Sequence, residues 1–119
     1  DAGIAVYPIL DTPRPGLKTY ARDCVVQHPE QLQSCGTPKS KAFEANDFTL
    51  PAAKLDPRVD VLDFSDQFCS NEFCPAVIGN VLVYRDKHHI SDTYMRTLAP
   101  VFDQRLLAAM DKDHLESSR

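Results

Sequence analysis

Four cysteines in two closely spaced pairs limit the fold of this 119-residue chain more than any other feature of its sequence. The neighbouring cysteines are Cys24 and Cys35, and then Cys69 and Cys74. Four cysteines permit three connectivities, and the local spacing with turn-prone residues between favours the pairs 24–35 and 69–74. Disulfides persist in oxidising compartments, so the pattern predicts a domain outside the cytoplasm.

A zinc site is the alternative use of these cysteines, with His28, His88 or His89 as further ligands. Closed zinc sites favour cysteine pairs separated by roughly two to four residues, whereas Cys24 and Cys35 lie much further apart. The spacing therefore favours disulfides, and we expect neither a metal nor a cofactor.

Charge and hydropathy exclude further classes of partner. The net charge of −4 argues against nucleic acid, because an acidic surface repels phosphates. No apolar run reaches the ~20 residues that cross a bilayer, and the sequence shows no secretory leader. The chain starts at Asp1 and enters an apolar run at once, so we expect a piece of a longer protein.

Short runs of β-forming residues predict an α/β fold. They lie at 3–10, 59–64, 77–78 and 80–84. The run 3–10 is apolar throughout, which is typical of a central strand covered on both faces. Asp11 and Thr12 follow it, at the strand end where ligands gather in open sheets. So few strands indicate part of a doubly wound parallel sheet, with residues 1–110 as one domain portion and 111–119 as a fraying polar tail.

The clearest helix covers 91–110, where apolar residues recur at steps of three and four. Ser91 is a good N-cap, and Pro100 predicts a kink or break near Leu98. A weaker helical pattern covers 40–54. We expect an aromatic core of Tyr7, Phe43, Phe48, Phe64 and Phe102.

A polar turn between the last β run and this helix holds Asp86 and His89, three residues apart. Histidine titrates near neutral pH and can take and return a proton. A carboxylate on its other ring nitrogen fixes the tautomer, as in a Ser-His-Asp triad. The plainer interpretation is a solvated loop, in which His88 is a neighbour and Arg85 pairs with Asp86.

The stretch 61–109 resembles the C-terminal end of an SGNH hydrolase domain, in particular the one fused to the bacterial membrane acyltransferase family three, which O-acylates cell-surface glycans. The matching residues are Cys69, Cys74, Tyr84, Asp86, His89 and Ser91. The run that ends at Asp11, Thr12 and Pro13, followed by two cysteines, adds to the likeness. The resemblance implies a three-layer α/β/α, flavodoxin-like fold, of which this chain is a fragment.

The resemblance implies that Asp86 and His89 are the triad Asp and His of an O-acyltransferase or esterase. The family's nucleophile lies in a Gly-Asp-Ser motif, and the sequence contains no such motif. We therefore expect an N-terminal part of the same domain to supply the serine, and this segment alone to be inactive. The implied acceptor is a cell-surface glycan, and the implied location is periplasmic or at the cell surface, tethered by the membrane acyltransferase domain.

The missing nucleophile also favours a second hypothesis, a non-catalytic carbohydrate-binding or accessory module. A concave surface at the strand ends would suffice for such a role. Water and a sugar hydroxyl are both open as the acyl acceptor in the enzymatic hypothesis.

Overall fold

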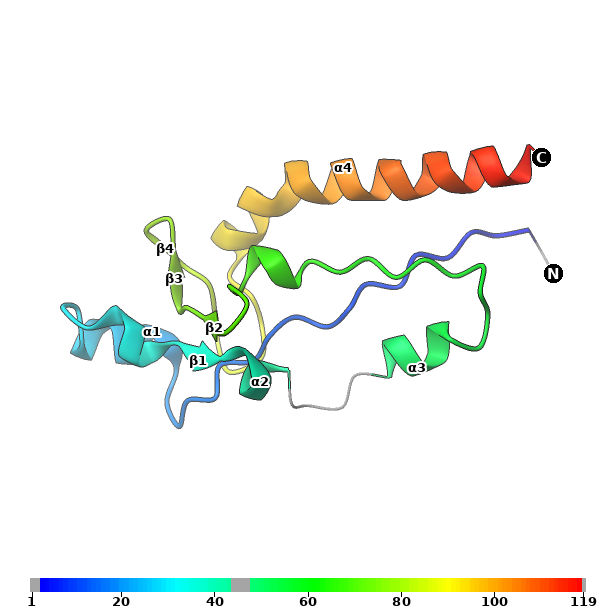
Figure 1. Ribbon diagram of the computed structural model, residues 1–119. Coiled ribbons are helices and arrows are strands. Elements are labelled where there is room, and N and C mark those ends of the chain that lie inside the picture. The colour runs from blue at the N-terminus through cyan, green and yellow to red at the C-terminus, as the bar shows by residue number, and fades with distance from the viewer. Residues whose placement is uncertain (1–2, 44–47, 119) are drawn as a thin grey trace.

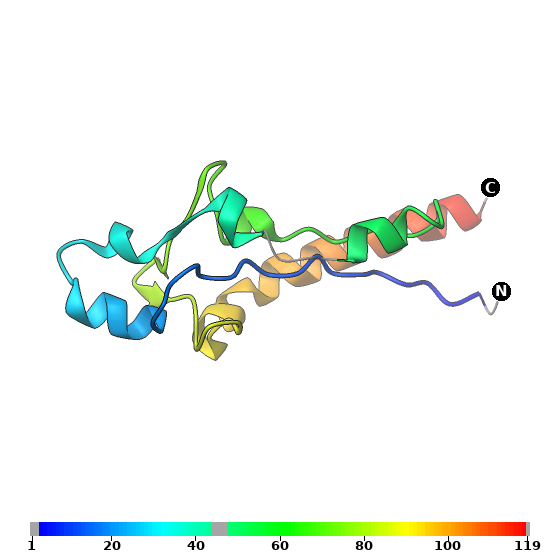
Figure 2. The same ribbon diagram turned by 90° about the horizontal axis from the view of Figure 1, so that it is seen from below.

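The computed structural model of the protein describes residues 3–43 and 48–118. They form an elongated molecule with extents of 57 × 27 × 23 Å. The short strands and the start of the last helix gather toward one end (Figure 1). At the other end three segments run side by side: the N-terminal run, the chain that leads to residue 62, and the second half of the last helix (Figure 2).

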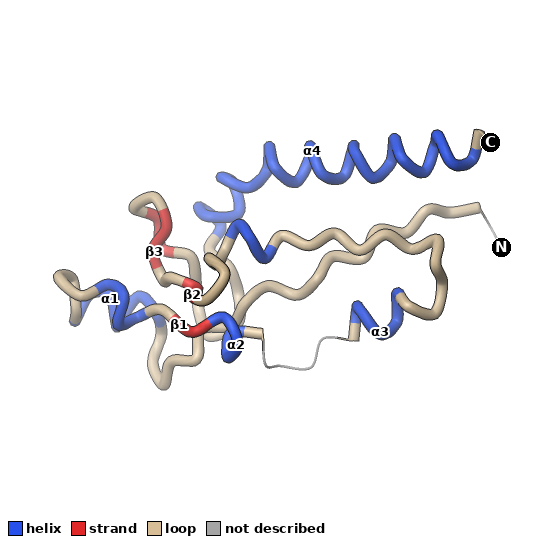
Figure 3. The backbone as a smooth tube through the Cα atoms, viewed as in Figure 1, coloured by secondary structure: helices blue, strands red, loops and turns tan. Residues whose placement is uncertain are grey.

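All elements are short except the last helix (Figure 3). In chain order they are α1 (Ala21–Gln27), the 3-10 turn η1 (Leu32–Cys35), β1 (Thr37–Pro38), α2 (Lys39–Ala42), α3 (Thr49–Ala53), the 3-10 turn η2 (Ser65–Gln67), β2 (Phe73–Cys74), β3 (Val77–Ile78), β4 (Val81–Leu82) and α4 (Asp92–Ser117). The helix expected over 40–54 is therefore two short helices, and residues 44–47 between them lie outside the described part of the chain.

The strands form two small antiparallel sheets, β1 with β2 and β3 with β4. Gly79 and Asn80 join β3 to β4 with φ values of 58° and 62°. Two successive left-handed residues are typical of a tight hairpin turn, whereas parallel strands need a crossover of about a dozen residues. A mixed α/β chain is confirmed, but the expected doubly wound, flavodoxin-like parallel sheet was wrong for the described residues.

The N-terminal apolar run is extended but not buried. Its parallel pairing with the second run is an isolated bridge between Ile9 and Leu62. Leu62 accepts a hydrogen bond from Leu10 and donates one to Pro8, at 2.9 and 2.8 Å. The side chains of Ile4 and Val6 are 77% and 58% exposed, so the expectation of a central strand was wrong. A central strand needs neighbours on both sides, and this pairing supplies one.

Both disulfides join the expected partners, Cys24 with Cys35 and Cys69 with Cys74. The first fastens α1 to η1, and the second closes the loop that leads into β2. Cys35 and Cys74 lie in the core, so each bridge anchors an irregular segment to it. Because all four sulfurs are used in this way, none is left as a thiolate for the zinc alternative.

The core packs the inner face of α4 against η2 and the hairpin. Tyr94 and Leu98 are buried, and the Phe102 ring stacks on Phe64 with centroids 5.5 Å apart. Tyr7 and Phe43 pack against the same cluster. Phe48 is 74% exposed, so its assignment to the core was wrong.

Helix α4 runs through Pro100 to Ser117, so the helix does not break there, and residues 111–117 of the expected polar tail continue the helix. Pro100 lies on the exposed side of the helix, where the carbonyl that it leaves unpaired can face water. Tyr7 donates to Asp113 at 2.5 Å, and Lys112 pairs with Asp60 at 3.1 Å. These contacts hold the second half of the helix. No helix in the described residues has the length and apolar content of a membrane span.

Candidate active site

A closed turn between β4 and α4 carries the predicted catalytic pair. Arg85 N donates to His89 O at 2.9 Å, and Tyr84 and Ile90 face each other across an antiparallel bridge. Ser91 N donates to Val83 O at 2.7 Å. The backbone of the turn is thus fixed by bonds between residues that are near neighbours in the sequence.

The Asp86 carboxylate is the centre of this turn. Its Oδ1 accepts hydrogen bonds from the backbone N–H groups of His88 and His89, both at 2.8 Å. The same carboxylate contacts Nδ1 of the His89 ring, with Oδ2 at 2.8 Å and Oδ1 at 3.0 Å. The backbone N–H of His88, then that of His89, then the imidazole hold the pKa of Asp86 well below its usual range.

The contact fixes how the His89 ring can act. An ionised carboxylate can only accept hydrogen bonds, so Nδ1 carries the hydrogen that it donates to Asp86, and Nε2 is left with the free lone pair. Nε2 makes no hydrogen bond within the described part of the chain, and the side chain is 64% exposed. The ring of His88 makes an edge contact with the ring of His89. Among the described residues, the His89 ring is the imidazole that contacts the Asp86 carboxylate. The expected Asp–His geometry is therefore present.

The base of the turn is hydrogen-bonded and largely buried. Ser91 Oγ donates to Leu82 O at 2.5 Å and accepts from Tyr94 N at 3.2 Å, so it ties β4 to the first turn of α4. Tyr84 is 2% exposed, and burial raises the pKa of its hydroxyl to about 12. A buried, capped base of this kind holds the turn in one place relative to the core.

Two cavities lie at the ends of the extended runs. The larger, about 690 Å³, has polar side chains in its wall, Asp11, Thr12 and Asp63 among them. The smaller, about 360 Å³, is mostly apolar and lies between the N-terminal run and α4. As expected, Asp11 and Thr12 line a pocket rim. Neither of these cavities, nor either of two others that described residues line, has Asp86 or His89 in its wall.

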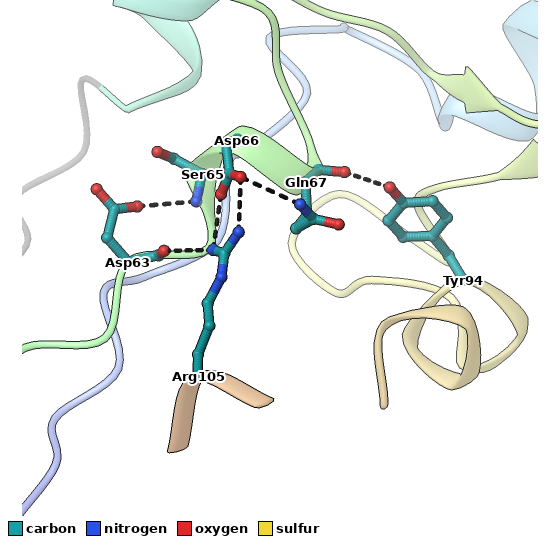
Figure 4. A network of polar contacts seen from close by, with 6 residues as sticks. All are labelled: Asp63, Ser65, Asp66, Gln67, Tyr94 and Arg105. Carbon is teal, nitrogen blue, oxygen red and sulfur yellow. Dashed lines mark hydrogen bonds and ion pairs between the residues drawn. The ribbon is translucent and has the colours of Figure 1, made fainter. Parts of the chain in front are cut away.

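A second polar network joins residues of η2 to residues of α4 (Figure 4). The guanidinium of Arg105 binds both carboxylate oxygens of Asp66, at 2.8 and 2.7 Å, and the carbonyl of Asp63 at 2.8 Å. This ion pair lowers the pKa of Asp66 to about 2. The Tyr94 hydroxyl donates to the carbonyl of Gln67 in the same turn. The network fastens η2 to α4.

The sequence did not point to the neighbours of the Asp–His turn. Lys87 Nζ lies 5.9 Å from the centre of the Tyr20 ring, and Arg22 lies 5.2 Å from it. Lys87 belongs to the turn, but Tyr20 and Arg22 are far from it in sequence, and no local pattern signals their proximity. Arg85, expected as a partner of Asp86, lies 3.8 Å from it and is 69% exposed.

Comparison with known proteins gives one finding. The family model described as "SGNH domain (fused to AT3 domains)" matches residues 1–104. No curated protein and no solved structure matches the chain.

Proposed function

The chain belongs to the family of SGNH domains fused to AT3 domains, and from this membership we propose that His89 is the general base of an extracytoplasmic O-acyltransferase or esterase domain. The observation that carries the proposal is the contact of Nδ1 with the Asp86 carboxylate at 2.8 Å. It leaves Nε2 free to exchange a proton with a reacting hydroxyl.

The reaction proceeds in two halves. Nε2 of His89 takes the proton of a serine hydroxyl as that oxygen attacks the acyl carbonyl, and the imidazolium returns the proton to the leaving group. In the second half the imidazole deprotonates a glycan hydroxyl, or water, as that oxygen attacks the acyl-serine carbonyl, and the imidazolium then protonates the serine oxygen as its bond to the acyl carbon breaks. Asp86 stabilises the imidazolium in both halves, and its low pKa keeps it ionised throughout.

The serine comes from outside this chain. The sequence lacks Gly-Asp-Ser, and within the described residues no serine hydroxyl is bonded to His89. Ser91, the nearest in sequence, is occupied as the cap of α4. The exposed run with Ile4 and Val6 and the apolar cavity beside α4 supply surface on which further strands of the same domain would pack.

The test replaces each histidine in the full-length protein. In His89→Ala we expect acyl transfer to a glycan to fall by roughly 10³-fold or more, since the proton relay is removed. The matched control is His88→Ala, whose backbone N–H still bonds Asp86, so its rate should stay near that of the parent protein. Transfer that survives in His89→Ala, or is lost equally in both variants, contradicts the assignment.

The absence of a nucleophile also favours a non-catalytic carbohydrate-binding or accessory module. A fluorophosphonate that labels active-site serines separates the two. Labelling of the full-length protein that depends on His89 supports the enzyme, and absence of labelling supports the binding module.

The two disulfides support an oxidising location, periplasmic or at the cell surface. The family's fusion to AT3 domains supports a membrane acyltransferase domain as the partner that tethers this chain and delivers the acyl group. The cell-surface glycan is then the acceptor.

A further inference from the structure

Tyr20, Arg22 and Lys87 form a cluster beside the Asp–His turn, here called the Tyr20 cluster. The Tyr20 ring is 40% exposed at the start of α1, and the two cations lie 5.2 and 5.9 Å from its centre. Lys87 belongs to the same turn as Asp86 and His89. A molecule bound at this cluster would therefore contact the Asp–His turn through Lys87.

The cluster carries more positive charge than its neighbours neutralise. Among the described residues no carboxylate lies within 4.0 Å of Lys87, and Arg22 reaches only Asp23, at 3.5 Å, with both groups largely exposed. Asp86 is already bonded to two backbone N–H groups and the imidazole, and Arg85 stays 3.8 Å from it. This local excess stands out on a chain with a net charge of −4.

Two cations held over an aromatic ring fit one chemical class well. Guanidinium and ammonium groups bind a carboxylate or a phosphate through charge-assisted hydrogen bonds. We infer that the Tyr20 cluster binds an anionic sugar residue of the acceptor glycan through Arg22 and Lys87. This inference rests on the proposed function for its acceptor.

The test is equilibrium binding of three sugars to the full-length protein, measured by titration calorimetry. Trigalacturonate carries carboxylates, galactose 6-phosphate carries a phosphate, and galactotriose is neutral. We expect at least one anionic probe to bind, with an affinity that falls as salt rises, and the neutral sugar to bind about tenfold more weakly. The two anionic probes distinguish a uronate from a phosphosugar.

Variants locate the binding. Lys87→Gln and Arg22→Gln should each weaken the anionic probe by roughly fivefold, and Tyr20→Ala should weaken it while Tyr20→Phe preserves it. Lys54→Gln removes one positive charge at the end of α3 and is the matched control, with unchanged affinity. Equal binding of acidic and neutral sugars, no binding of the acidic ones at millimolar concentration, or equal loss in Lys54→Gln would overturn the inference.

His89→Ala keeps the two hypotheses apart, because binding at the Tyr20 cluster does not need the imidazole. Loss of acyl transfer in His89→Ala with no preference for anionic sugars leaves the proposed function standing and removes only the inference. Acyl transfer that persists in His89→Ala removes the proposed function, whatever the binding data show.

Discussion

One carboxylate, that of Asp86, both closes the backbone of a turn and holds an imidazole. It accepts two backbone N–H bonds and the Nδ1 contact at 2.8 Å. The pair was predictable from the sequence because its two residues are only three positions apart, so local geometry decides the contact. The Arg105–Asp66 pair spans 39 positions, and no local pattern signals it.

Replacing the Asp86 carboxylate by an amide should reduce acyl transfer far more than the small change in side-chain size suggests. In Asp86→Asn the amide no longer enforces a proton on Nδ1, so we expect acyl transfer by the full-length protein to fall by about 10³–10⁴-fold. The check is the rate beside that of Asp23→Asn, which removes a carboxylate elsewhere. A loss of less than about tenfold in Asp86→Asn would argue against the orienting role.

Acid should weaken the bond between η2 and α4. The folded pKa of Asp66, about 2, lies below its ordinary value of 3.8, so this group contributes stability above pH ~4 that disappears as pH falls through about 2. The pair is largely exposed, so the contribution is at most ~1 kcal/mol. Urea unfolding at pH 6 and pH 2.5 should show a smaller acid loss for Asp66→Asn than for the parent chain. An identical loss of stability in the variant and the parent chain would contradict the contribution of Asp66.

Among the elements, the existence and start of α4 were the most predictable features. Its C-terminal end was the least predictable. Ser91 and the apolar repeat fix where the helix begins and which face is buried. Its extension to Ser117 depends on Asp113 and Lys112, which reach Tyr7 and Asp60 across the molecule. Contacts of that range override the frayed end that the polar composition suggests.

The cap at Ser91 should contribute measurably to stability. Its hydroxyl bonds both Tyr94 N and Leu82 O, so Ser91→Ala leaves two backbone groups without that partner. We expect the free energy of unfolding to fall by ~1–2 kcal/mol. Ser117→Ala, at the exposed end of the same helix, is the control and should change it by less than ~0.5 kcal/mol. Equal effects of the two changes would be inconsistent with the capping role.

The β3–β4 turn depends on a glycine for its backbone, not for space. A Cβ at Gly79 would meet nothing within 4 Å, but its φ is +58°. Gly79→Ala should therefore cost ~1–2 kcal/mol through conformation alone. Urea unfolding of the variant and the parent chain measures it. A neutral Gly79→Ala would mean that the turn relaxes to another form.

At the scale of the whole molecule, the sequence indicated several of the short elements but not how they pair in space. The Gly79–Asn80 pair is a recognisable hairpin signal, yet the runs around it were assigned to a parallel sheet. The apolar run with Ile4 and Val6 looked central because nothing in a sequence tells a buried strand from one whose partners are elsewhere. Local bonds were therefore predictable, and long-range pairing was not.

The first disulfide should hold the irregular half of the molecule to the rest. Replacing Cys24 and Cys35 together by serine releases α1 from the core, and we expect a loss of about 2–3 kcal/mol in the free energy of unfolding. Urea unfolding of the double variant, compared with the parent chain under oxidising conditions, checks this. An unchanged midpoint would show that packing alone keeps α1 in place.

The turn around Asp86 is stapled almost wholly by bonds among its own near neighbours, from Leu82 to Tyr94. The conformation of this turn, here called the cassette, therefore depends little on contacts with the rest of the fold. Evolution could move such a cassette between sheets of quite different curvature, and a protein engineer could graft it at another strand–helix junction and retain a pre-aimed imidazole.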